Sequence, residues 1–306
     1  MLIFMPIAVV ATIIQVGRNA VQRQMLPTAG PWAVSLVRFM FGLPFTAAFI
    51  LVARLFTPET QGQFSAHFLI LCAVGALAQI LAQSALLVCM QRSSFAIGTA
   101  FFQTSLPFTA VVGALVFHDP LSLLAWTGIA VVTGGLTVLS WPKRGEGRLV
   151  DYSPIVFGLL CGALTAVSAN AFRQGGRIFE PQHPVYSALV CLLVVQAVQT
   201  VMLGTVLGIG NRRSVRAALV SMPSAIGSGF GSAAASGLWF VAYTLAPAAL
   251  VRAVGVLEMP LAALTGRRLF AERLTWMQIL AGVVTAAGVV MAAVGFCPWG
   301  FVRRWV

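Results

Sequence analysis

The sequence predicts an all-α polytopic membrane protein with ten transmembrane helices, arranged as two inverted five-helix repeats. Three observations predict it: a composition too apolar for a water-soluble surface, ten mainly apolar runs of spanning length, and a pattern that recurs halfway along the chain. Of 306 residues, 59% are hydrophobic and 8% are charged, whereas a soluble domain carries about a quarter charged residues. A single water-soluble globule is therefore excluded.

The apolar runs have the length needed to cross a membrane. About 20 helical residues cross about 30 Å of hydrocarbon. The predicted spans cover residues 2–22, 31–55, 66–90, 94–117, 121–141, 153–174, 184–208, 222–244, 247–269 and 274–296. Each run is predicted as a helix, because backbone groups in lipid must bond internally and the runs lack the alternation of barrel strands. The first run begins at the N-terminus and lacks the pattern of a signal peptide. A short hydrophilic segment before Met1 is therefore one expectation.

The charged residues indicate a lipid surface rather than a nucleic acid. The net charge is +12, from 19 basic and 7 acidic residues, and the basic residues stand singly or in short groups between apolar runs. This placement is typical of loops at lipid headgroups. The five cysteines form no Cys-x-x-Cys pair, so no metal site and no disulfide framework is predicted. The expected partners are the bilayer and a small-molecule substrate, without a cofactor, for a monomer or homodimer.

One sequence pattern occurs twice. The segment Phe117–Ser122, Phe-His-Asp-Pro-Leu-Ser, recurs 153 residues later as Phe270–Thr275, Phe-Ala-Glu-Arg-Leu-Thr. The same offset maps Pro107 onto Pro260. Several matches at one offset predict an internal duplication of the chain.

The number of spans in each repeat decides its topology. Residues 1–148 and residues 149–306 each hold five predicted spans. Because five is odd, the second repeat enters the membrane from the opposite side. Inverted repeats of this kind are typical of secondary transporters, whose substrate site lies near the membrane midplane between the repeats. The predicted function is therefore transport by alternating access, not catalysis.

Short motifs accompany the repeat. They are Arg38-Phe39 in the second span, Pro107 and Pro260 in the fourth and ninth, and Glu272–Thr275 before a glycine-bearing last span. With them the chain resembles the drug/metabolite transporter superfamily, in its ten-helix EamA-type branch. The resemblance implies export of a small metabolite, an amino acid or a drug-like compound across the cytoplasmic (inner) membrane, usually by proton exchange. One departure is Val16–Asn19, Val-Gly-Arg-Asn, where relatives often carry Trp-Gly-Ser-Asn.

Polar residues inside the spans are the candidates for substrate binding, because a polar group facing lipid is costly. Gln79 and Gln83 lie four residues apart, on one helix face. The repeat offset carries them to two serines of span eight, Ser232 and Ser236, on a face that continues to an aromatic pair. The candidate substrate-binding residues are Asn19, Arg38, Gln79, Gln83, Ser236, Trp239, Tyr243 and Arg252. The alternative role of the amides and serines is helix–helix hydrogen bonding.

Two charged residues inside spans suggest more specific chemistry. Arg38 either reaches back to the interface or anchors an anion, since its planar fork matches a carboxylate or phosphate. Glu258 is the only acidic residue deep inside a predicted span, and a carboxylate there can bind and release a proton. Glu258 is therefore the candidate for proton coupling. The alternative is a permanent ion pair with Arg252 or Arg38.

Other function classes stay open. Within transport, the alternative is an organic-anion or phosphorylated-metabolite exchanger that uses Arg18, Arg38 and Arg252. Outside transport, the alternatives are a membrane-embedded enzyme and a non-transporting scaffold. No catalytic residue is predicted, because the three histidines lie at loop edges and no nucleophile motif or phosphate-binding glycine loop is present.

The membrane orientation has two opposing predictions. Twelve basic residues fall on one predicted side and five on the side of the termini. The positive-inside rule then places both termini outside the cell. The family resemblance implies the reverse.

Overall fold

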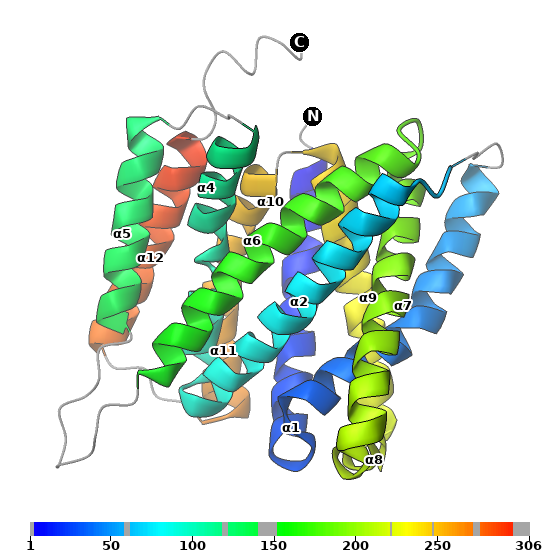
Figure 1. The fold of residues 1–306 in the computed structure, drawn as a ribbon. Coiled ribbons are helices and arrows are strands. Elements are labelled where there is room, and N and C mark those ends of the chain that lie inside the picture. The colour runs from blue at the N-terminus through cyan, green and yellow to red at the C-terminus, as the bar shows by residue number, and fades with distance from the viewer. Residues whose placement is uncertain are drawn as a thin grey trace.

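Every element that the structure describes is a helix (Figure 1). The computed structural model describes residues 3–57, 62–117, 122–139, 152–220, 222–246, 248–271 and 276–295. The elements are α1 (Phe4–Phe56), α2 (Ala66–Arg92), α3 (Phe95–Phe102), α4 (Ser105–Phe117), α5 (Leu123–Leu139), α6 (Ser153–Phe179), α7 (Pro184–Gly210), α8 (Arg212–Val220), α9 (Met222–Leu245), α10 (Ala248–Val254), the 3₁₀ turn η1 (Gly255–Leu257), α11 (Glu258–Leu269) and α12 (Trp276–Gly295). The predicted all-α class is confirmed for these residues.

Five of the described helices are long and apolar enough to cross a membrane, namely α1, α2, α6, α7 and α9. The longest, α1, contains 53 residues and is not straight. Gly30 interrupts it with φ 75° and ψ 165°, and the chain turns back there (Figure 1). We call residues 4–29 the N-terminal leg of α1 and residues 31–56 its C-terminal leg. The first span was predicted to end near residue 22, and its helix instead continues to this bend.

Two predicted spans are interrupted at corresponding positions. The fourth is divided into α3 and α4, and the ninth into α10, η1 and α11. The second part begins at Ser105 in one case and at Glu258 in the other, 153 residues apart. Pro107 and Pro260 follow these starts, and proline cannot donate a hydrogen bond to the carbonyl four residues earlier. Each proline therefore removes one helical hydrogen bond at the interruption.

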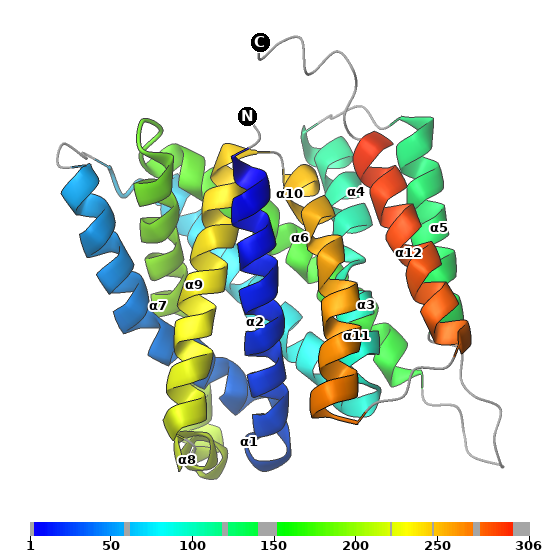
Figure 2. The same cartoon turned by 180° about the vertical axis from the view of Figure 1, so that it is seen from behind.

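The main helix contacts join the first half of the chain to the second. The N-terminal leg of α1 lies beside α9, α2 packs on α6, and α5 and α12 form a pair at one edge of the bundle (Figures 1 and 2). Under the repeat offset, α2 corresponds to α9 and the N-terminal leg of α1 to α6. The contact of α1 with α9 is therefore the counterpart of the contact of α2 with α6.

The polarity of the bundle is opposite to that of a soluble protein. Large apolar side chains such as Leu55, Ile70 and Val206 are exposed, with 80%, 61% and 67% of their surface accessible. Arginine, glutamine and glutamate side chains are instead buried between the helices. Lipid solvates exposed apolar side chains, whereas polar side chains in lipid are costly. The buried polar residues therefore indicate where a water-soluble substrate binds.

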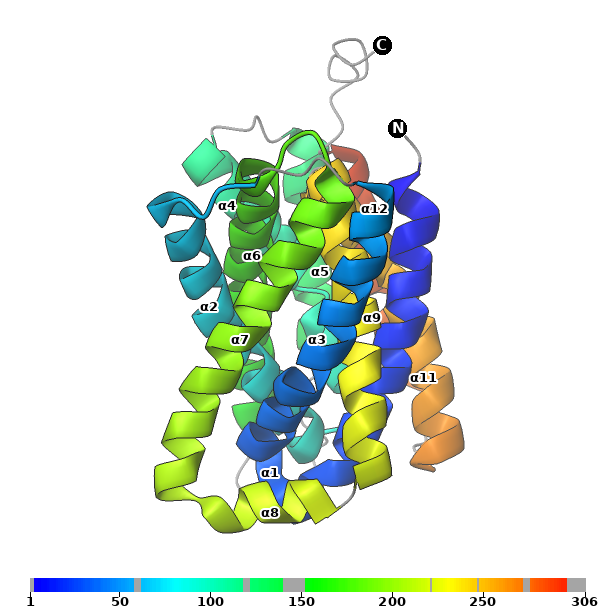
Figure 3. The ribbon, with the colours of Figure 1, turned by 90° about the vertical axis from the view of Figure 1, so that its right-hand side faces the viewer.

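Helix α8 differs from the others in direction and composition. It runs across one end of the bundle, away from the first residues of α1 and the last residues of α12 (Figure 3). Arg212, Arg213 and Arg216 are exposed, whereas Val215 and Leu219 pack against the core. This division between a charged and an apolar face is typical of a helix at a membrane interface.

Some predicted features lie outside the described residues. They are the boundary between residues 148 and 149, and the repeat-related acidic residues Asp119 and Glu272.

Candidate functional site

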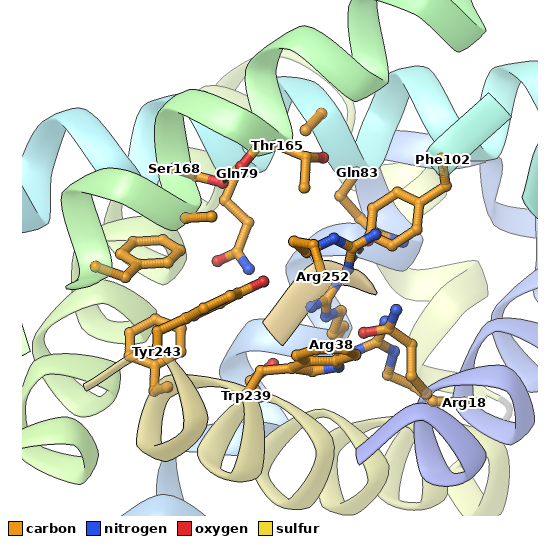
Figure 4. Close-up of a pocket in the computed structure, with 16 residues that line it drawn as sticks. Arg18, Arg38, Gln79, Gln83, Phe102, Thr165, Ser168, Trp239, Tyr243 and Arg252 are labelled. Atoms are coloured by element: carbon orange, nitrogen blue, oxygen red, sulfur yellow. Dashed lines mark hydrogen bonds between the residues drawn. The ribbon is translucent and has the colours of Figure 1, made fainter. Parts of the chain in front are cut away.

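A cavity of about 50 Å³ lies among helices from both halves of the chain. Its lining comes from both legs of α1 and from α2, α3, α6, α9 and α10. A buried water needs roughly 10–15 Å³ on this measure, so the cavity has room for roughly three to five waters. That space suits the head group of a small molecule. Figure 4 shows three arginines gathered on one side of it, and Gln79, Ser168 and Tyr243 on the other.

Arg252 is held from several directions. Its Nε donates to Ser105 Oγ at 3.0 Å, and its Nη1 lies 3.9 Å from Glu258 Oε1. The guanidinium lies over the rings of Phe102 and Trp239, at 4.4 and 5.2 Å from their centroids. These contacts fix the guanidinium in one place, with one edge toward the cavity.

Arg38 is anchored by neutral partners on two other helices. Its Nε donates to Ser232 Oγ at 3.0 Å, and its Nη1 donates to Gln83 Oε1. Gln83 Nε2 in turn donates to Gln22 Oε1 at 2.9 Å, and Gln22 Nε2 donates to Ser228 Oγ at 3.2 Å. This chain of hydrogen bonds joins both legs of α1 to α2 and α9. Arg38 does not pair with Glu258, and it does not reach the interface, because only 2% of its surface is exposed.

Arg18 is oriented by the residue beside it. Its Nε and Nη2 donate to Asn19 Oδ1 at 3.2 and 2.8 Å. Asn19 itself does not line the cavity. The Val-Gly-Arg-Asn sequence, which departs from the usual family sequence, thus places Arg18 in the cavity wall, and Asn19 orients it.

Glu258 lies behind the cavity wall and is fully buried. Gln15 Nε2 donates to its Oε1 at 2.7 Å, and Gln103 Nε2 donates to its Oε2 at 3.3 Å and to Gly255 O at 3.0 Å. Gln103 sits at the interruption between α3 and α4, and Glu258 at the one before α11. The two interruptions therefore touch, and Glu258 is the charged group at their junction.

The side of the cavity away from the arginines is neutral. Gln79 Oε1 accepts from Gln199 Nε2 at 2.7 Å, and Thr165 and Ser168 contribute hydroxyls from one face of α6. The rings of Trp239 and Tyr243 stack with their centroids 5.9 Å apart, and they join this side to the arginines, because Trp239 lies beneath Arg252. This side can take hydrogen bonds or apolar contact, and the structure places no carboxylate in its lining.

In the cavity lining, three buried N–H donors have no acceptor among the described residues. They are Nη1 of Arg18, Nη2 of Arg252 and Nε1 of Trp239. All three residues line the cavity. A buried donor without a partner is costly, so an unsatisfied group in a site indicates a missing acceptor. The cavity is thus built to receive acceptor atoms.

The structure brings together seven of the eight predicted substrate-binding residues, all except Asn19, in the lining of one cavity. Gln103 and the α6 hydroxyls of Thr165 and Ser168 were missed. The spacing of Thr165 and Ser168, three residues apart, places them on one helix face and could have indicated them. Gln103 could have been found only through the interruption after α3.

The sequence model of the EamA-like transporter family matches residues 2–141. Residues 2–141 belong to the EamA-like transporter family. That family is part of the drug/metabolite transporter superfamily, so the predicted resemblance is confirmed for this half. Together with the apolar helices, the EamA-like match of residues 2–141 points to an integral, multi-pass membrane protein.

The comparison with curated sequences finds no relative, whereas the comparison with solved structures finds a protein of the same fold. No curated protein matches the chain in sequence. Among 27 matching chains of solved structures, one crystal structure superposes with a TM-score of 0.60, over 99% of this chain and 97% of its own. It is 13% identical, and at that identity the likeness shows a shared fold alone.

Proposed function

We propose that the chain is a secondary active transporter that crosses the cytoplasmic membrane ten times and exports a small metabolite by alternating access. Membership of residues 2–141 in the EamA-like transporter family supports transport. Under this proposal, residues 1–148 and 149–306 form two five-helix repeats, and the second inserts in the opposite direction to the first.

Ten crossings account for every described helix except α8. The two legs of α1 make two, and α2, α5, α6, α7, α9 and α12 make one each. The interrupted pairs α3–α4 and α10–α11 make the remaining two. Broken helices are tolerated at membrane depth where they are buried in protein or line a cavity, and α3 and α10 both contribute to the cavity wall.

A two-fold relation between the repeats is supported by paired features, and the odd number of proposed crossings in each repeat makes this relation an inverted one. The helix interruptions recur at an offset of 153 residues, and the contact of α1 with α9 is the counterpart of that of α2 with α6. Repeats that only followed each other end to end would not make these reciprocal contacts, in which α1 packs on α9 and α2 packs on α6.

The position of the cavity is the observation that carries the transport proposal. It collects buried polar side chains from both proposed repeats at the point where two broken helices touch. In transporters with inverted repeats, substrate and coupling-ion sites lie at such breaks near the midplane. Rocking of one repeat against the other would open this cavity to each side in turn.

We assign proton coupling to Glu258, because it contacts both the broken helices and Arg252. Protonation of Glu258 would weaken its attraction to Arg252 and free that guanidinium to move with its helix. The alternative is that Glu258 stays ionised as a structural partner of Arg252. The two roles predict different transport by Glu258→Gln: exchange without coupling in the first case, and loss of exchange and export alike in the second.

The test is efflux from cells preloaded with a panel of small metabolites. Wild type is expected to export at least one compound in unchanged chemical form, and Arg38→Ala is expected to abolish its export. Glu258→Gln is expected to retain exchange along a gradient and to lose export against one. Arg216→Gln, which removes an exposed arginine of α8, is the control and is expected to behave as wild type. Chemical conversion of the compound during passage would favour an enzyme and refute the proposal.

A further inference from the structure

We infer that the substrate is a small organic anion without an ammonium group, held by Arg18, Arg252 and Trp239. This inference rests on the proposed transport function and specifies the substrate class of the same cavity. It depends on the charge balance of the cavity, on the direction of its open donors and on the neutrality of its far side.

The charge balance favours an anion. Arg18, Arg38 and Arg252 line the cavity, and each has 5% or less of its surface exposed. Among the described residues only one carboxylate, that of Glu258, contacts this group. Three guanidinium charges and one carboxylate leave two positive charges uncompensated in a low-dielectric environment. Buried charge of one sign requires a partner of the other, and a bound anion provides it.

The open donors face the same space. The described hydrogen bonds of Arg18 and Arg252 orient their side chains and use other atoms of each guanidinium. The donors without a partner in the described part of the chain are Nη1 of Arg18 and Nη2 of Arg252. Trp239 adds its Nε1 from the ring that lies beneath Arg252. None of these three groups can accept a hydrogen bond. Carboxylate, phosphate and sulfonate oxygens accept several hydrogen bonds at once, and they fit this arrangement of donors.

The charge of the cavity favours an anion over a zwitterion. An amino acid carries an ammonium close to its carboxylate, so its net charge is zero and it would leave the two positive charges of the cavity uncompensated. The lining opposite the arginines consists of amide, hydroxyl and aromatic groups. Glu258 does not neutralise an ammonium there, because it lies outside the lining and is paired with Arg252. A hydroxyl or apolar substituent fits this lining without adding a positive charge to it.

The experiment measures ligand-induced thermal stabilisation of the purified full-length protein in detergent, at constant ionic strength. The probes are matched pairs: lactate and lactamide, benzoate and benzamide, glycerol 3-phosphate and glycerol, with L-alanine as the zwitterion. We expect at least one anion to raise the melting temperature, and its neutral partner and L-alanine to leave it unchanged. Comparing the carboxylates with the phosphate distinguishes the two kinds of head group.

Three variants test the residues. Trp239→Phe keeps an aromatic ring but removes the indole N–H, and should weaken anion binding about tenfold. The double variant Arg252→Gln/Glu258→Gln removes the Arg252 guanidinium and its open Nη2 donor without leaving Glu258 unpaired. It leaves the net charge of the cavity unchanged, and it should abolish binding because that donor is lost. Arg216→Gln removes an arginine outside the cavity and should bind as wild type.

The outcomes separate the inference from the proposed function. Stabilisation by L-alanine or by a neutral partner, no response to any anion, or unchanged binding in both cavity variants would overturn the inference. An anion that binds as expected but is not carried across liposome membranes would refute transport and leave the anion site intact.

Discussion

The Nη1 atom of Arg252 lies 3.9 Å from the Oε1 atom of Glu258, although six residues separate them on one predicted span. On an uninterrupted α-helix, residues six apart point in different directions. The turn η1 changes the path of the chain between them, and Gln103 holds that turn by donating to Gly255 O. The ion pair therefore depends on the interruption, which in turn depends on a residue of the other half of the chain.

Neutralising one member of this pair should destabilise the fold more than neutralising both. Glu258→Gln leaves the Arg252 charge buried, and loss of one partner of a buried pair costs about 3–5 kcal/mol. Arg252→Gln/Glu258→Gln should recover most of that loss. Unfolding of the detergent-purified variants gives the free energies for a double-mutant cycle. Additive effects of the two substitutions would show that the pair contributes no coupling energy.

The bend of α1 should depend on one glycine. Gly30 has φ 75° and ψ 165°, a conformation that is essentially restricted to glycine, and an added Cβ would meet no atom within 4 Å. Gly30→Ala should therefore lower the free energy of unfolding by about 1–3 kcal/mol through backbone strain alone.

Gly17→Ala is the matched control for the bend. Gly17 lies in the helical N-terminal leg, also with nothing within 4 Å of an added Cβ. Alanine should be neutral or slightly stabilising there, by about 0.5–1 kcal/mol. Equal melting temperatures for Gly30→Ala and Gly17→Ala would contradict the strain assigned to Gly30.

Most of the polar lining could be predicted from spacing. Gln79 and Gln83 share a helix face because they are four residues apart, and the repeat offset extends the argument to Ser236. The cost of a polar group in lipid then points these faces inward. These predictions use the spacing of residues on one helix and the cost of a polar side chain in lipid. Neither requires the positions of the other helices.

The interruptions and the cross-helix contacts could not be predicted in the same way. Pro107 and Pro260 mark missing hydrogen bonds, but a proline can bend a helix or break it, and the packing around it decides which. Gln103 becomes important only because α3 ends beside η1. The pairing of Glu258 with Arg252 rather than Arg38 likewise depends on tertiary positions.

Close contact between α1 and α9 should depend on Gly229. A Cβ atom there would lie 2.6 Å from the backbone C of Phe41, which cannot move away as a flexible side chain would. Gly229→Ala should lower the free energy of unfolding by about 1–3 kcal/mol. Gly227→Ala, two residues earlier on the same helix, meets no atom within 4 Å and should leave the melting temperature near that of wild type. A loss of stability in Gly227→Ala as large as in Gly229→Ala would indicate an effect of helix flexibility rather than of packing.

The exposed arginines of helix α8 predict the orientation of the protein in the membrane. Arg212, Arg213 and Arg216 are exposed at the end of the bundle opposite the start of α1 and the end of α12 (Figure 3). Arg18 does not contribute to the charge of that end, because it is buried in the cavity wall. The positive-inside rule still places α8 in the cytoplasm, since the arginines of α8 are exposed there and favour the anionic leaflet. A phosphatase reporter fused after Val306 should then be active outside the cytoplasm. Activity only of a cytoplasmic reporter at this position would reverse the orientation and show that the α8 arginines face the other leaflet.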